Sequence, residues 1–169
     1  DALPIYEAQQ AGIVVVTAVG NATDEAGYDL AEVPVYPACN FADSASTTII
    51  RVTGTDSLDQ HAPYANHGSA CTDIAAPGHE LVGAHPVDLP EGSESTSTYE
   101  HVAGLTGTSV ASPMVAGTVA LIASVNPALT GEEIRKIILT TADSIEPGVS
   151  AGGKGDLGYG RLNTERAVK

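Results

Sequence analysis

Residues 12–19 read Gly-Ile-Val-Val-Val-Thr-Ala-Val, an almost unbroken run of β-branched residues. A strand with one face in water would alternate apolar and polar residues, and this stretch does not alternate. A strand that is apolar on both faces is typical of the centre of a parallel sheet, where helices cover both sides. The sequence therefore predicts a central parallel strand over residues 12–19.

Short apolar segments elsewhere in the chain indicate further strands. They lie at residues 47–53, 72–75, 81–84 and 99–103. Helical patterns lie at residues 4–10, 109–125, from 130 onward and 162–168. Strands that alternate with helices indicate the α/β class. A chain of 169 residues has the size of a single domain.

Two of the expected helices carry a strong local signal. The helix over residues 109–125 is apolar or small on all sides, so we expect it to be buried in a soluble core. Its apolar part is slightly short for a bilayer span. Residues 130–133 read Thr-Gly-Glu-Glu, a capping box that predicts the start of the next helix.

The chain is strongly acidic, with 21 Asp and Glu against 7 Lys and Arg and a formal net charge of −14. Such a surface repels phosphate backbones and anionic lipid, so we expect no nucleic-acid or membrane partner. Met114 is the only methionine. We therefore expect the natural polypeptide to extend upstream of Asp1.

Residues 107–117 read Gly-Thr-Ser-Val-Ala-Ser-Pro-Met-Val-Ala-Gly and place Ser109 at a glycine-led turn into the apolar helix. The free N–H groups and the positive dipole end of a helix N-terminus suit a developing oxyanion. Without other information, a simple helix N-cap is the favoured interpretation of this segment.

Asn21 follows directly on the strand at residues 12–19 and Gly20. Ligands of open α/β sheets bind at the carboxyl ends of strands, and a side-chain amide can donate to an oxyanion. An asparagine in a turn after a strand is the simpler alternative.

Taken together, these segments resemble the subtilisin family of serine proteases. The similar segments, in the family's order, are residues 12–21, 33–38, 64–69, 73–78, 107–117 and 158–163. The match spans nearly the whole chain, and the segment at 107–117 is its most specific part. The resemblance implies that residues 1–169 are the C-terminal part of one subtilisin-like peptidase domain. Its doubly wound, mostly parallel sheet, with helices on both faces, would be incomplete at the N-terminus.

The resemblance also implies an activity, that of a serine endopeptidase that cleaves polypeptide substrates through an acyl-enzyme on Ser109. The Asn21 side chain and the Ser109 N–H would hold the oxyanion, with Thr108 as a supporting donor. No cofactor is implied for catalysis. The residue before the cut would bind in a pocket lined by Ala18, Val19, Gly20, Val35, Tyr36, Pro37 and Ala38. Val35 stands where the family often has glycine, so we expect a shallow apolar pocket.

The aspartate and histidine of the family's catalytic triad have no counterpart in this sequence, because the motifs Asp-Ser/Thr-Gly and His-Gly-Thr-His do not occur. We expect the five histidines present to be structural or exposed. A serine without a base is a poor nucleophile. We therefore expect this chain alone to be inactive and the missing N-terminal part of the domain to supply both residues.

Two alternatives to this interpretation stay open. The first is a non-catalytic protease homologue that serves as a binding or scaffold module. The second is an unrelated serine hydrolase that pairs Ser109 with a histidine of this chain.

A structural calcium ion is often bound near the pocket loop in this family. The resemblance assigns such an ion to the carbonyls of Ala38 and Asn40 and the carboxylate of Asp73, oxygen ligands that suit calcium. A polar loop without an ion is the equal alternative. The same match brings Cys39 near Cys71 and implies a disulfide, which is typical of a secreted or extracellular protein. Two free thiols are the alternative.

Overall fold

The structure, a computed structural model, describes residues 3–41, 47–86, 99–149 and 153–169. A parallel sheet forms its centre, with the strands in the order β1, β2, β3. These strands are β1 (Val15–Ala18), β2 (Ile49–Thr55) and β3 (Ile74–Pro77). All residues of β2 are buried, because it has a neighbouring strand on each edge.

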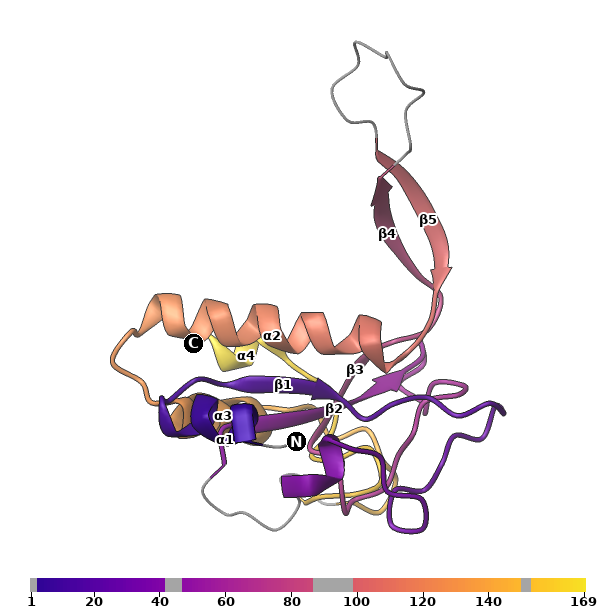
Figure 1. The fold of residues 1–169 in the computed structure, drawn as a ribbon. Coiled ribbons are helices and arrows are strands. Elements are labelled where there is room, and N and C mark those ends of the chain that lie inside the picture. The colour runs from indigo at the N-terminus through magenta and orange to yellow at the C-terminus, as the bar shows by residue number, and fades with distance from the viewer. Residues whose placement is uncertain (1–2, 42–46, 87–98, 150–152) are drawn as a thin grey trace.

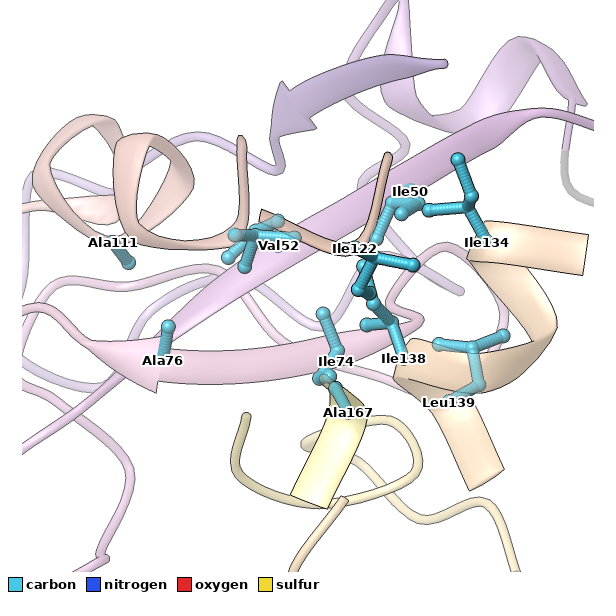
Figure 2. Close-up of a cluster of buried hydrophobic side chains, with 11 residues drawn as sticks. Ile50, Val52, Ile74, Ala76, Ala111, Ile122, Ile134, Ile138, Leu139 and Ala167 are labelled. Carbon is cyan, nitrogen blue, oxygen red and sulfur yellow. The ribbon is translucent and has the colours of Figure 1, made fainter. Parts of the chain in front are cut away.

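Three helices cover one face of this sheet: α2 (Thr108–Val125), α3 (Gly131–Thr140) and α4 (Thr164–Ala167). Their side chains meet those of β2 and β3 in one apolar core (Figure 2). The core consists of Ile50, Val52, Ile74, Ala76, Ala111, Val115, Ile122, Ile134, Ile138, Leu139 and Ala167. Full burial of each large aliphatic side chain contributes about 1.5–3 kcal/mol.

The helix α1 (Leu3–Gln10) lies against the other face of the sheet. Its Ile5 lines a small apolar cavity together with Val15 and Ile49. Successive residues of a strand point to opposite faces, so Ile49 faces away from the core that contains Ile50. Helices on both faces of a parallel sheet confirm the predicted α/β class.

The predicted capping box is present at the start of α3. The Glu133 N–H donates to Thr130 Oγ1 at 3.3 Å, and the Thr130 N–H donates to Glu133 Oε2 at 2.8 Å. Both N–H groups would otherwise lack partners in the first turn, so the two side chains fix where α3 begins.

The predicted strand pair is also present, as the antiparallel strands β4 (Leu81–Pro86) and β5 (Tyr99–Leu105). The ribbon that they form projects away from the rest of the molecule (Figure 1). Its C-terminal strand leads directly into Gly107 and α2. A short 3-10 helix, η1 (Ala38–Phe41), lies between β1 and β2 in the chain.

Two burial predictions were wrong. The expected central strand, β1, lies at an edge of the described sheet, and its residues are only half-buried. The helix expected to be buried all round, α2, exposes one side with Met114, Leu121 and Val125. The apolar pattern of both elements exceeds what the described residues can cover, since only one edge of β1 and one face of α2 have partners there.

By length and composition alone, α2 could cross a membrane: its mean hydropathy is 1.6, and 28% of it is buried in this structure. The described residues pack α2 across β1, β2 and β3, with its buried side chains in the core. This placement is that of a core helix of a globular domain.

Candidate active site

Ser109 occupies the second position of α2 and is exposed. The residue before the helix, Gly107, has a φ of 142°, a value that side chains rarely permit, and no side chain caps the helix there. The Ser109 N–H lies in the first helical turn, where no carbonyl of the helix can reach it. The segment therefore presents both a hydroxyl and a backbone donor at the positive end of the α2 dipole.

Asn21 lies beside this helix start, just beyond the carboxyl end of β1. Its Oδ1 accepts the Thr108 N–H at 3.0 Å. Because a backbone N–H needs an acceptor, this bond assigns the oxygen to the Thr108 side and turns the NH₂ group of Asn21 the other way.

The Asn21 amide and the Ser109 hydroxyl converge on one small space at Gly107. A Cβ atom on Gly107 would lie 3.3 Å from Asn21 Nδ2 and 3.3 Å from Ser109 Oγ. Any side chain at this position would fill the space between the two groups. Asn21 Nδ2 and Ser109 Oγ therefore lie on the same side of Gly107, and a side chain at this position would crowd both groups.

Thr108 lies behind this space rather than in it. It is fully buried, and its Oγ1 accepts the Gly20 N–H at 3.2 Å. We expected Thr108 to be a supporting donor beside the oxyanion. By accepting the Gly20 N–H, its hydroxyl helps to fix the turn that carries Asn21, and the hydroxyl proton is left to donate.

Asn66, a residue that the sequence did not single out, also holds the turn at Val19 and Gly20 in place. It is buried, its Nδ2 donates to the Val19 carbonyl at 3.1 Å, and its N–H donates to the Gly20 carbonyl at 3.0 Å. Its Oδ1 accepts the Tyr28 N–H at 3.0 Å. Its position within the segment 64–69 was the only signal for it in the sequence.

Part of the predicted pocket lining is brought together around Gly20. Val35 Cγ1 lies 3.3 Å from the point where a Cβ on Gly20 would be. Val19 and Ala38 are fully buried in an apolar cluster that Val35 contacts. This arrangement places Val35 against the strand end that holds Asn21.

Tyr36 and Pro37 do not join this lining. The Tyr36 side chain is 64% exposed, and Pro37 lines the cavity beside α1 with Ile5 and Val15. Ala18 is the half-buried last residue of β1. Of the predicted pocket residues, the structure therefore gathers those nearest to Gly20.

The pocket loop is held by a disulfide between Cys39 in η1 and Cys71, whose Cα atoms are 5.0 Å apart. The Cys39 N–H also donates to the Val35 carbonyl at 2.9 Å. The bridge thus connects the loop that contains Val35 to the segment that leads into β3.

Asp73, the expected calcium ligand, is buried among positive charges. Its two carboxylate oxygens accept from Arg51 Nε at 2.7 Å and Arg51 Nη2 at 2.6 Å. Arg135 Nη2 donates to it at 3.0 Å, and Lys154 Nζ lies 3.8 Å away. Within the described residues, no group of three acidic, histidine or cysteine side chains could hold a metal ion.

These contacts change the acidity of Asp73. Burial by itself would raise the pKa of its carboxyl, but the hydrogen bonds and charge of Arg51, with the charges of Arg135 and Lys154, hold that pKa below its ordinary value. An oxygen that already accepts from guanidinium groups does not fit a calcium ligand. Asp73 therefore does not fit as the carboxylate ligand of the expected calcium site in this arrangement.

The described histidine side chains are engaged elsewhere. His61 Nε2 lies 2.6 Å from the Ala65 carbonyl oxygen, and its ring packs edge-on against that of His67. His79 Nδ1 lies 3.2 Å from Thr106 Oγ1. Among the side chains that the structure describes, no histidine hydrogen-bonds to the Ser109 hydroxyl.

Comparison with known families places residues 1–163 within the model of the Subtilase family, Peptidase S8. Thermitase of Thermoactinomyces vulgaris is 36% identical over 159 residues, which are 94% of this chain and 45% of the relative. A thermophilic serine proteinase of Bacillus sp. strain AK1 is 34% identical, over 93% of this chain and 31% of its own length. The chain thus spans less than half the length of these relatives.

Solved structures show the same fold. A protease structure from Pseudoalteromonas arctica PAMC 21717 is 26% identical, with a TM-score of 0.68, over 97% of this chain and 44% of that chain. The prenylagaramide maturation protease PagA, 22% identical with a TM-score of 0.68, covers 97% of this chain and 52% of its own. Both matches support the α/β architecture described above.

The charge cluster at Asp73 predicts a pH dependence of stability. Because the folded pKa is depressed, this carboxylate stabilises the fold above its unfolded pKa of about 4, and the contribution is lost as pH falls through the lower folded pKa. Asp73→Asn should cost about 3 kcal/mol or more at neutral pH, since it leaves buried cations unpaired. It should also remove part of the stability loss below about pH 4. Thermal unfolding between acid and neutral pH measures both effects.

The matched control is Glu132→Gln, which changes an exposed carboxylate of α3. We expect it to leave the unfolding free energy at neutral pH nearly unchanged. A variant Asp73→Asn with the stability of the unmodified protein at neutral pH would contradict the role given to Asp73.

Proposed function

The chain belongs to the subtilase family, and from this membership and the geometry at Ser109 we propose that the complete protein is a serine endopeptidase. Ser109 would be its nucleophile, and Asn21 would stabilise the oxyanion. The observation that carries the proposal is the convergence of Asn21 Nδ2 and Ser109 Oγ on the space at Gly107.

The chemistry would proceed through an acyl-enzyme. Ser109 Oγ attacks the carbonyl carbon of the peptide bond and gives its proton to a base, while the carbonyl oxygen gains the negative charge. The Asn21 amide and the Ser109 N–H donate to that oxygen, and the α2 dipole favours the charge. The C–N bond then breaks as the amine leaves with the proton, and water hydrolyses the acyl ester in the same way.

The base of this reaction would come from outside the chain. The side chains of His61, His67 and His79 make other contacts, and none of the three hydrogen-bonds to Ser109 Oγ. The relatives are more than twice as long as their matched part, so they contain other segments in which such residues could lie. We therefore expect the aspartate and histidine in the missing N-terminal part of the domain, and no activity in this chain alone.

Two surfaces of the chain suit that missing part as a partner. One is the exposed side of α2, which presents Met114, Leu121 and Val125. The other is the outer edge of β1, which has no strand beside it among the described residues. An open edge and an apolar helix face are liabilities unless another part of the protein covers them.

The substrates would be polypeptides with a modest apolar side chain before the cut. Val35 approaches Gly20 closely and packs against the buried apolar cluster of Val19, Leu30 and Ala38. A disulfide favours an oxidising compartment, and one relative is an extracellular protease of Xanthomonas campestris pv. campestris. Both support a secreted or extracellular location.

Asn21→Ala tests the oxyanion assignment in the complete protein. We expect kcat for a peptide substrate to fall roughly 10²–10³-fold with little change in KM, the loss known for an oxyanion-hole asparagine of a subtilisin. Asn40→Ala, an exposed residue of η1, is the control and should change kcat little. An unchanged kcat in Asn21→Ala would contradict the assignment, and a complete protein without peptidase activity would favour the non-catalytic alternative.

Leu121→Glu tests whether the exposed side of α2 is covered in the complete protein. Leu121 is 50% exposed in this chain, so the variant should hardly change the chain's own stability. In the complete protein it should cost about 3 kcal/mol or more, since it would bury an unpaired carboxylate. Denaturant unfolding measures the change. Lys136→Glu, exposed on α3, is the control, and equal stability of the two complete variants would argue against a partner on α2.

A further inference from the structure

We propose that Arg51, with Arg135 beside it, replaces a bound metal ion in holding the substrate-pocket loop of this protein. The loop, Val35–Ala38, would then keep its position without calcium. The inference rests on the proposed function only in naming this loop as part of the substrate pocket.

The geometry at Asp73 indicates that the guanidinium group of Arg51 occupies the place of a cation beside this carboxylate. Arg51 Nε donates to Asp73 Oδ2 and Arg51 Nη2 donates to Asp73 Oδ1, so the guanidinium binds both carboxylate oxygens. The backbone N–H of Arg51 also donates to Oδ2, at 3.1 Å. Paired N–H groups of this kind match a carboxylate in both charge and shape. Arg51 and Asp73 are both almost fully buried, so water does not weaken the pair.

The balance of charge around Asp73 excludes a further cation. One carboxylate faces two guanidinium groups and the ammonium of Lys154. The cluster therefore has a surplus of positive charge within a chain whose formal net charge is −14. A calcium ion here would have to displace Arg51 from Asp73 and would meet repulsion from the remaining cations.

The cluster is connected to the pocket loop through covalent and hydrogen bonds. Arg51 Nη1 donates to the Ala70 carbonyl at 3.4 Å, and the Asp73 N–H donates to the Arg51 carbonyl at 2.8 Å. Cys71 lies between these two contacts and is bonded to Cys39, which follows the loop. Arg51 is thus a positioning residue, since it acts on the pocket through this segment.

Two readouts on the complete protein test the proposal. The first is backbone hydrogen exchange in residues 33–41, which reports on the loop whether or not the protein is active. We expect the same exchange in EDTA and in millimolar CaCl₂, and exchange about tenfold faster in Arg51→Gln than in the unmodified protein. The second is steady-state kinetics, in which Arg51→Gln should raise KM about tenfold and change kcat much less.

Two further variants and the comparison with EDTA serve as controls. Arg51→Lys should restore part of the protection and of KM, since it keeps the charge but not the paired geometry. Arg166→Gln removes an exposed arginine that pairs with Asp143 and should change neither readout. Faster exchange of the loop in EDTA would overturn the proposal, even if Arg51→Gln does not fold. A protein without peptidase activity would overturn the proposed function alone, because the exchange readout does not depend on it.

Discussion

Two hydrogen bonds tie the end of β1 to the start of α2, and the arrangement of the site depends on them. The Thr108 N–H donates to Asn21 Oδ1, and the Gly20 N–H donates to Thr108 Oγ1. The partners are 87 and 88 residues apart, so only the folded sheet can bring them together. Because both bonds involve backbone groups, they fix the Asn21 amide and the Ser109 turn relative to each other before any substrate arrives.

A series of buried polar contacts extends this constraint into the rest of the fold. Asn66 holds the carbonyls of Val19 and Gly20, and Thr53 of β2 donates to the Asn66 carbonyl at 2.6 Å. Buried polar groups of this kind stabilise a unique arrangement only when all of them have partners, which Asn66 does. The apolar core on the other face of the sheet supplies the bulk of the stability, and this polar network sets the position of Asn21 and of the turn that carries Ser109.

The sequence predicted those features that depend on short-range pattern. The turn at Gly107 and the capping box at Thr130 each need only a few neighbouring residues, so local chemistry determines them. The ion pair of Arg51 and Asp73 joins residues 22 positions apart, and no local pattern signals it. The burial of α2 and β1 was overestimated for a related reason. Among the described residues, only one edge of β1 has a neighbouring strand and α2 leaves Met114, Leu121 and Val125 exposed.

Labelling with a fluorophosphonate probe tests whether Ser109 is a nucleophile whose base lies outside this chain. We expect label on Ser109, located by mass spectrometry, in the complete protein. We expect none in the complete protein with Ser109→Ala and none in the isolated 169-residue chain. Label on Ser109 in the isolated chain would contradict a base outside it, because a base would then be present locally. A folded complete protein that takes up no label would contradict the nucleophile itself.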